Sequence, residues 1–216
     1  MINNDGIYVN FPDYQVDTET ELGKQPLGHG MVIAVDPTNG RTRGSEYGRY
    51  KNSGKFKGVA RRVIVPDFKM ATPGSPTQEE LDAYAKSLDR SYGHSGGRTQ
   101  VYYLKDADYN SLVEKMKSAE SGNEKTGYYQ NKPYSILNHN CGTYAADMLK
   151  DSMPMWAKAK INATSGNINP LSGWNAFGTP SMSAPKSLVV KRGQYDNPNI
   201  KSQGLFKQVL GAINKK

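Results

Sequence analysis

An uninterrupted apolar run at residues 31–35, directly after His29 and Gly30, constrains the fold of this chain more than any other segment. A short run that is apolar at every position is typical of a central strand with both faces covered. Residues 37–40 follow as a turn signal, and residues 41–50 can return as the antiparallel partner. The segment therefore predicts a β-hairpin inside a sheet, with His29 at the start of its first strand.

His29 has the best placement for chemistry among the three histidines of the chain. If the turn centres near residues 38–39, the positions facing His29 across the ladder lie close to Glu46, Tyr47 and Gly48. Glu46 is then within diagonal reach of the imidazole, where a carboxylate can hold the ring and favour its charged form. Glycines on both sides of His29 indicate close approach of another group to this backbone. The alternative is a strand histidine whose polar atoms are satisfied within the fold.

The single cysteine of the chain, Cys141, stands at the predicted start of an amphipathic helix. Asn140 is a good N-cap, and apolar residues recur after it at helical spacing. The macrodipole and the unpaired N–H groups of a first turn favour thiolate over thiol, which lowers the pKa of a cysteine there. Cys141 is therefore a candidate nucleophile, and the alternative is a buried free cysteine that packs as a small hydrophobe. The apolar stripe of the helix consists of Cys141, Tyr144, Ala145, Met148 and Leu149.

The other two histidines have weaker claims to a catalytic role. His139 is too close to Cys141 in sequence to aim its ring at the thiol, so we expect a loop residue or part of a pocket wall. His94 lies in a connection rich in glycine and serine, where a solvated histidine is expected. One cysteine and three scattered histidines do not form a zinc-binding pattern, and the sequence predicts neither a structural metal nor a cofactor.

These motifs resemble those of papain-like cysteine hydrolases of the NlpC type, in the circularly permuted order in which the histidine strand precedes the cysteine helix. The matching segments are residues 28–30 with the apolar strand, residues 46–50 (EYGRY) and residues 140–144 (NCGTY). The asparagine–cysteine pair recurs in several permuted groups, including relatives of lecithin retinol acyltransferase, whereas the 46–50 string is narrower. The bacterial subgroup that these motifs resemble includes cell-wall-degrading effectors of type VI secretion. The resemblance covers roughly the first two-thirds of the chain.

The resemblance implies acyl transfer, in which His29 withdraws the Cys141 proton, the thiolate attacks an amide carbonyl and water hydrolyses the thioester. It carries the nucleophile onto Cys141 and the base onto His29. Glu46 is assigned as the third, orienting residue from its position in the hairpin. No metal is expected in this mechanism. The predicted substrate-binding residues are Tyr47, Arg49 and Asn140.

Two assignments stay open between alternatives. The Cys141 backbone N–H is a natural oxyanion donor, and the second donor is open among Tyr8, Asn138 and the glycines around His29. Arg49 and Tyr50 either touch a peptide substrate or only close the hairpin, as surface arginines commonly do.

The rest of the chain predicts an α+β fold, with an antiparallel sheet packed on helices as in the papain-like, permuted NlpC-type class. Strands and helices alternate along the first part of the chain, and none of the helix stripes indicates a cofactor site. The expected elements are strands at residues 58–65, 99–104 and 187–191, a short extended entry into the cysteine helix at residues 134–137, a helix beginning at the capping box of residues 77–80, and a helix that begins at Asp106 or Asp108 and ends before Gly122.

We expect one domain, because no repeat or charge block divides the chain. Residues 1–152 form the predicted papain-like core, and residues 153–216 form an irregular extension rich in proline, glycine and serine, packed on the same domain. The extension either lines the substrate cleft or wraps the core, anchored by its large aromatic side chains. It ends in a predicted amphipathic helix at residues 205–213, which is too short to span a bilayer. The anchoring aromatics are Trp156, Trp174 and Phe177.

The formal net charge of +8 favours anionic surroundings. Peptidoglycan, with its stem-peptide carboxylates, provides them. Nucleic acid is not expected as a partner, because the lysines are dispersed and no nucleic-acid motif is present. Residues 1–6 are polar and lack the pattern of a secretory signal peptide, which leaves a cytoplasmic protein or one delivered by a dedicated machine.

The resemblance favours a peptidoglycan amidase or endopeptidase that a secretion machinery delivers into the periplasm of a target bacterium, with an immunity protein as a further partner. Two other classes of function remain open. One is a thiol acyltransferase or isopeptidase that acts on lipid or protein and shares the cysteine–histidine pair. The other is a non-catalytic binding module of the same fold, which would tolerate the Cys141→Ala substitution without loss of effect.

Overall fold

The computed structural model of the chain describes residues 5–11, 14, 16–17, 24–25, 28–50, 57–92, 97–122, 129–135, 139–152 and 189–198, and the statements below concern these residues. Several predictions lie outside them. These are His94, Asn138, the helix at residues 205–213, and the aromatic anchors Trp156, Trp174 and Phe177.

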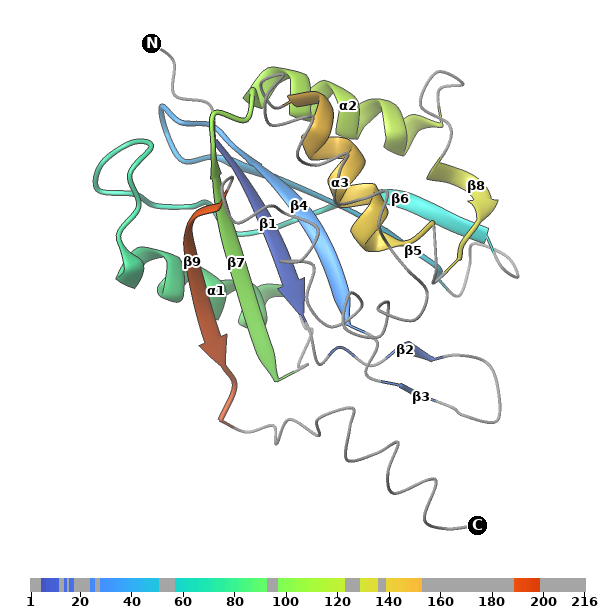
Figure 1. Cartoon of the computed structure of the whole chain (residues 1–216), viewed down its shortest axis with the longest axis horizontal. Helices are drawn as coiled ribbons and strands as arrows, with labels where there is room; N and C mark the ends of the chain where they lie inside the picture. Colours follow the sequence, from blue (N-terminus) through green and yellow to red (C-terminus); the bar gives the residue numbers. More distant parts are fainter. Residues whose placement is uncertain are drawn as a thin grey trace.

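A seven-stranded sheet forms the centre of the molecule, in the order β8-β6-β5-β4-β1-β7-β9 (Figure 1). Each pair of neighbouring strands is antiparallel. Two short strands, β2 (Val16–Asp17) and β3 (Lys24–Gln25), pair separately. The strands of the main sheet are β1 (Asp5–Phe11), β4 (His29–Val35), β5 (Thr42–Gly48), β6 (Lys57–Val63), β7 (Arg98–Lys105), β8 (Gln130–Pro133) and β9 (Val189–Asp196).

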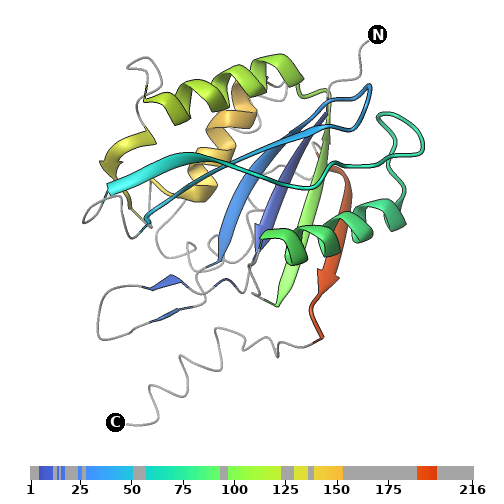
Figure 2. The same cartoon turned by 180° about the vertical axis from the view of Figure 1, so that it is seen from behind.

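Helices cover both faces of this sheet. Helix α1 (Gln78–Tyr92) lies on one face, and α2 (Tyr109–Ser121) and α3 (Cys141–Ser152) lie on the other, as the two opposite views show (Figures 1 and 2). The core is accordingly split into two clusters, one on each face of the sheet. The apolar run of β4 contributes to both clusters, since its residues alternate between the faces and are all buried. The mixed α/β architecture with an antiparallel sheet agrees with the predicted α+β class.

The hairpin predicted around residues 37–40 is present. Strand β5 pairs with β4, and the register places Met31 opposite Glu46 and Val35 opposite Thr42. At the turn, the carboxylate of Asp36 accepts hydrogen bonds from the Thr38 backbone N–H at 2.9 Å and the Thr38 hydroxyl at 2.6 Å. The side chain thereby fixes the turn, and the turn fixes which residue of β5 lies near His29.

The helix starts also follow the sequence signals. Thr77 and Glu80 form the predicted capping box, because the Glu80 N–H donates to the Thr77 hydroxyl at 3.1 Å and the Thr77 N–H donates to Glu80 Oε2 at 2.7 Å. Of the two aspartates considered for α2, Asp108 is the N-cap, and Gly122 ends the helix in the left-handed conformation with φ of 71°. These caps confirm the predicted starts of α1 and α2 and the end of α2.

One strand in the middle of the sheet was not predicted. No element was expected at residues 5–11, yet β1 lies between β4 and β7. The extended segment expected at residues 134–137 follows β8; Ser135 forms an isolated bridge with His139, and residues 136–137 lie outside the described residues. The strand expected at residues 187–191 corresponds to β9, which pairs with β7 at the edge of the sheet and continues to Asp196. No helix in the described part of the chain is long and apolar enough to cross a bilayer.

Candidate active site

The first residue of β4 and the first residue of α3 meet at one end of the sheet. These residues are His29 and Cys141, and their side chains are hydrogen-bonded to each other. Gly28 precedes His29 with φ of 79°, a conformation that favours glycine and that turns the chain into the strand. The local structure thus brings together two side chains that are far apart in sequence.

Helix α3 holds Cys141 at its N-terminus as predicted. The Asn140 side-chain oxygen accepts hydrogen bonds from the backbone N–H of Gly142 at 2.9 Å and of Thr143 at 3.1 Å, which makes Asn140 the N-cap. The stripe residues that follow Cys141 are buried against the sheet. Cys141 therefore stands where the helix dipole stabilises a negative charge on sulfur. The buried stripe residues are Tyr144, Ala145, Met148 and Leu149.

Glu46 holds the other side of the His29 ring. Since Met31 pairs with Glu46 across the hairpin, Glu46 lies diagonal to His29, and its Oε2 is 2.6 Å from His29 Nε2. Because Nε2 is engaged with Glu46, the second ring nitrogen, Nδ1, is the one left to face the Cys141 thiol. The three side chains form a connected Cys141–His29–Glu46 array.

The Glu46 carboxylate is completely buried but fully hydrogen-bonded. Its second oxygen, Oε1, accepts from the Tyr50 hydroxyl at 2.6 Å and from Arg61 Nε at 2.6 Å. Burial acts to raise the pKa of Glu46, but the hydrogen bonds and charges of His29, Tyr50 and Arg61 outweigh it and lower this pKa to about 2. Glu46 is therefore a carboxylate at neutral pH.

The same contacts set the charge of His29 and Cys141. Burial acts to lower the pKa of His29, but the hydrogen bonds to Cys141 and Glu46 and their negative charges raise it to about 10. Burial acts to raise the pKa of the Cys141 thiol, whereas the hydrogen bond and charge of His29, the Gly30 N–H and the Tyr134 hydroxyl lower it below its ordinary value. The site therefore favours a thiolate–imidazolium pair, the reactive form of a cysteine nucleophile.

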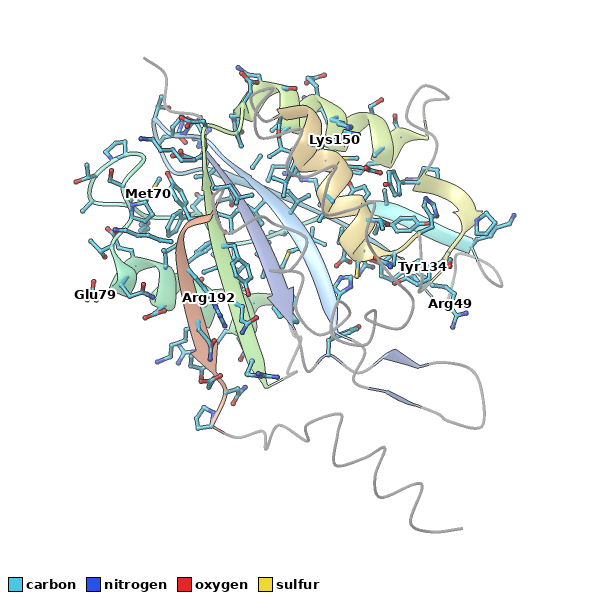
Figure 3. The ribbon with its side chains drawn as sticks, viewed as in Figure 1. Arg49, Met70, Glu79, Tyr134, Lys150 and Arg192 are labelled. Carbon is cyan, nitrogen blue, oxygen red and sulfur yellow. The ribbon has the colours of Figure 1, made fainter. Side chains whose placement is uncertain are left out.

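Tyr134 was not singled out by the sequence, and it contacts the nucleophile. Its hydroxyl lies close enough to hydrogen-bond both the sulfur and the backbone N–H of Cys141. Figure 3 shows Tyr134 beside the N-terminal end of α3. The contact depends on the backbone turn in which Ser135 and His139 exchange hydrogen bonds of 2.9 and 3.0 Å. No local spacing signals such a turn, because it is made by the loop that joins β8 to α3.

The ring of Tyr14 lies next to the ring of His29, with the two centroids 5.3 Å apart. Tyr14 comes from the segment that follows β1, an element that the sequence analysis did not propose. Its backbone carbonyl accepts a hydrogen bond from the Gly28 N–H at 3.1 Å, which ties this segment to the start of β4. Tyr14 and Tyr134 thus flank the histidine and the cysteine, respectively.

The predicted substrate-binding residues occupy three different environments. Tyr47 is completely buried, and its hydroxyl lies 3.1 Å from His139 Nδ1, so its position does not suit direct contact with a substrate. Asn140 is nearly buried and its side chain caps α3. Arg49 is half-buried at the same end of the molecule and points outward (Figure 3). Only Arg49 has a position open to a large ligand.

His139 packs into the interior of the fold. It is buried, it stacks on Tyr129 with centroids 5.0 Å apart, and its Nδ1 lies 2.9 Å from the Pro133 carbonyl oxygen. Its contacts make His139 part of the aromatic packing in front of α3. Across the described residues, no group of three or more His, Cys, Asp or Glu side chains is arranged to hold a metal ion.

Fold and site together define a mixed α/β protein whose antiparallel sheet carries a hydrogen-bonded cysteine–histidine–glutamate array at one end, with the histidine and the glutamate buried. Residues 6–157 match the model of a protein family described as type VI secretion system effector, TseH-like. The match covers more than half of the chain, and the protein therefore belongs to this family of type VI secretion effectors.

A solved structure agrees with this assignment. The crystal structure of the type VI secretion system effector TseH is similar to this chain, with a TM-score of 0.55 and 26% sequence identity, over 70% of this chain and 77% of the TseH chain. A comparison with curated proteins finds no match.

Proposed function

We propose that this protein is a cysteine hydrolase of amide bonds in peptidoglycan, built on a papain-like fold of the permuted NlpC type. The observation that carries the proposal is the hydrogen-bonded Cys141–His29–Glu46 array, in which both the nucleophile and its base begin an element of secondary structure. The order of the chain, with the histidine strand before the cysteine helix, supports the permuted arrangement.

In the proposed reaction, the Cys141 thiolate attacks the carbonyl carbon of a peptide amide, and a carbon–sulfur bond forms as the carbonyl oxygen becomes an oxyanion. His29 then gives its proton to the leaving nitrogen, and the carbon–nitrogen bond breaks. In the second half, His29 takes a proton from water, and the resulting hydroxide attacks the thioester. The carbon–sulfur bond then breaks, the acid product leaves and gives up its proton to solvent, and the Cys141 thiolate–His29 imidazolium pair is restored.

Two donors suit the oxyanion. The Cys141 backbone N–H belongs to the first turn of α3 and has no partner within the helix. The Tyr134 hydroxyl lies close to the same N–H and to the sulfur. Burial and the negative charge of Cys141 raise the pKa of Tyr134 well above its usual value, so the phenol keeps its proton and can donate it in a hydrogen bond. Tyr134 is thus our candidate for the second donor that sequence reasoning left open.

The remaining predicted residues take distinct roles in this proposal. Glu46 orients His29 and stabilises its charged form. Asn140 shapes the first turn of α3 as its N-cap, and Tyr47 supports the wall of the site from the core. Arg49 is the residue that we assign to direct contact with the substrate, since it is the one predicted contact with an outward position.

Membership of the effector family supports delivery by a secretion machinery into a target bacterium. The net charge of +8 suits a substrate that carries carboxylates, and peptidoglycan stem peptides fit this description. We therefore propose the periplasm of the target cell as the place of action, and an immunity protein of the producing cell as a partner that blocks the site.

Expression in two compartments of a Gram-negative bacterium tests this function. The wild-type protein carrying an added export signal is expected to lyse the cells, whereas the same protein without the signal leaves them intact. Exported Cys141→Ala protein at equal abundance is expected to be harmless, and it serves as the matched control. Lysis by both exported proteins would instead support a non-catalytic binding module. Toxicity confined to the cytoplasm would favour an acyltransferase or isopeptidase with a cytoplasmic target.

A further inference from the structure

We propose that Arg61 is a positioning residue that acts through Glu46 to keep Cys141 in its reactive, ionised form. The proposal rests on the proposed function, since it takes Cys141 as the nucleophile. Arg61 does not contact Cys141 or His29 through any described hydrogen bond, and sequence reasoning gave it no role. Its effect passes along the hydrogen-bonded series Arg61–Glu46–His29–Cys141.

The geometry around Glu46 Oε1 is the basis of the proposal. Arg61 faces Glu46 directly across the β5–β6 ladder, and its Nε lies 2.6 Å from Oε1. The Arg61 guanidinium lies over the Tyr50 ring, with its central carbon 3.7 Å from the ring centroid. The Tyr50 hydroxyl donates to the same Oε1 at 2.6 Å. Arg61 and Tyr50 therefore hold each other and the carboxylate in a three-membered cluster.

The exposure of the cluster members separates an electrostatic role from a structural one. The Glu46 side chain is 0% exposed, whereas the Arg61 side chain is 48% exposed. An ion pair with one exposed partner adds little to the stability of a fold. A positive charge next to a buried carboxylate, in contrast, strongly favours the ionised carboxylate. We therefore expect the loss of Arg61 to change the protonation of the site more than the stability of the protein.

The direction of the effect follows from charge. Without Arg61, the negative charge of the buried Glu46 carboxylate is no longer balanced by the cation that faces it across the ladder. The unbalanced carboxylate disfavours a second negative charge in the same site, so the Cys141 thiolate is less stable and the pKa of the thiol rises. The titratable and charged groups that surround Glu46 and this series are Tyr14, His29, Tyr50, Arg61, Tyr134, Cys141 and Tyr144.

The neighbouring arginine provides a matched control. Arg62 follows Arg61 in β6 and is also exposed, but it pairs with Ser45, so its side chain leaves the opposite face of the strand. Arg62→Met thus removes the same charge from the same strand without touching Glu46.

The test is the rate of alkylation of Cys141 by iodoacetamide between about pH 4 and pH 10. Cys141 is the single cysteine of the chain, so the reaction reports this thiol alone. We expect Arg61→Met to move the midpoint of the rate profile upward by about one pH unit, which is about a tenfold lower rate on the acidic side. Arg62→Met is expected to keep the wild-type profile, and Arg61→Lys is expected to lie between.

Each outcome bears on one claim. A low wild-type midpoint that Arg61→Met leaves in place overturns the role of Arg61 and leaves the proposed nucleophile intact. A wild-type midpoint at the ordinary thiol value, about 8.5, overturns the proposed nucleophile itself. If Arg61→Met does not fold, as judged by its circular dichroism, Arg61→Gln is measured and judged by the same criterion. Because alkylation needs no substrate, the result does not depend on whether the protein cuts peptidoglycan.

Discussion

Two carboxylates of this protein are completely buried, yet they have opposite electrostatic environments. Glu46 receives hydrogen bonds from His29, Tyr50 and Arg61, and its pKa falls to about 2. Asp5 begins β1 and pairs with Val35, at the end of β4 far from His29. Among the described residues, the Tyr103 hydroxyl is the only side chain close to the Asp5 oxygens as a donor, without the geometry of a full hydrogen bond, and burial raises the pKa of Asp5.

The comparison shows that partners, and not depth, decide whether a buried carboxyl is charged. Desolvation opposes the ionised form at both positions, but only Glu46 has donors that offset it. Near Asp5 the charge of Asp106 adds to desolvation, while Tyr103 and Lys105 counter them only in part. Glu46 is thereby suited to hold a positive charge on His29. Asp5 has no such function in our account and should cost stability at neutral pH.

The largest expected effect comes from Glu46→Gln, which keeps the shape of the side chain and removes its charge. We expect hydrolysis of peptidoglycan to fall by about 10²- to 10⁴-fold, because His29 loses the group that orients it and stabilises its proton. Glu120→Gln is the control, since Glu120 accepts hydrogen bonds from Ser45 and Arg43 in another buried network. Muropeptide release measures the effect, and wild-type activity in Glu46→Gln would remove Glu46 from the mechanism.

Asp5→Asn should have the opposite effect to Glu46→Gln. It should change the stability of the protein and leave its activity unchanged. Removing a buried charge that its neighbours offset only in part is expected to raise the free energy of unfolding at pH 7 by about 1–3 kcal/mol. Urea unfolding measures this change. The control is Asp36→Asn, which alters a carboxylate with three hydrogen bonds at the hairpin turn and should lower stability slightly. A loss of stability in Asp5→Asn would show that Asp5 has a stabilising partner.

The two carboxyls also predict opposite pH dependences of unfolding. Glu46 has a folded pKa of about 2, below its ordinary 4.5, so its contribution is present above pH 4.5 and is lost as the pH falls towards 2. Asp5 has a folded pKa above its ordinary 3.8, so its contribution is present below pH 3.8 and is lost as the pH rises through the folded pKa.

Unfolding free energies measured across this acidic range therefore separate the two groups. Glu46→Gln should flatten the fall in stability below pH 4.5, and Asp5→Asn should flatten the fall above pH 3.8. Curves for both variants that stay parallel to that of the wild type would contradict the contrast between the two sites.

The smallest expected effect comes from Tyr50→Phe, which removes one hydrogen bond to Glu46 and leaves those of His29 and Arg61. A loss of about 1 kcal/mol corresponds to about a fivefold lower alkylation rate of Cys141 on the acidic side of its profile. Tyr195→Phe on β9 is the control, since this strand lies at the far edge of the sheet. A loss of alkylation rate as large as that caused by Glu46→Gln would mean that Tyr50 affects Cys141 independently of its hydrogen bond to Glu46.

The contact between His29 and Glu46 could be predicted because local signals fix it. The apolar run of β4, the turn at residues 37–40 and the alternation of a strand together set the register, and register alone brings Glu46 to His29. The start of α3 could be predicted for a similar reason, since Asn140 is an N-cap within one turn of Cys141. Both features depend on residues that are close in sequence.

The features that could not be predicted depend on contacts between residues that are far apart in sequence. Strand β1 contains Asp5, Gly6 and Asn10, which interrupt its apolar pattern, and it is identified as a central strand only by its neighbours β4 and β7. Arg61 faces Glu46 because of the β5–β6 register. No turn was predicted between these two strands, so this register could not be predicted from the sequence. Tyr134 reaches Cys141 through a loop whose shape the local sequence does not specify.

The most direct test of the central claim is to incubate purified wild-type protein and Cys141→Ala separately with purified peptidoglycan and to identify the released muropeptides by chromatography and mass spectrometry. We predict new fragments with wild type alone, whose masses identify the amide bond that is cut. Fragments released equally by both proteins, or by neither under conditions in which a known amidase is active, would contradict a cysteine-dependent peptidoglycan hydrolase.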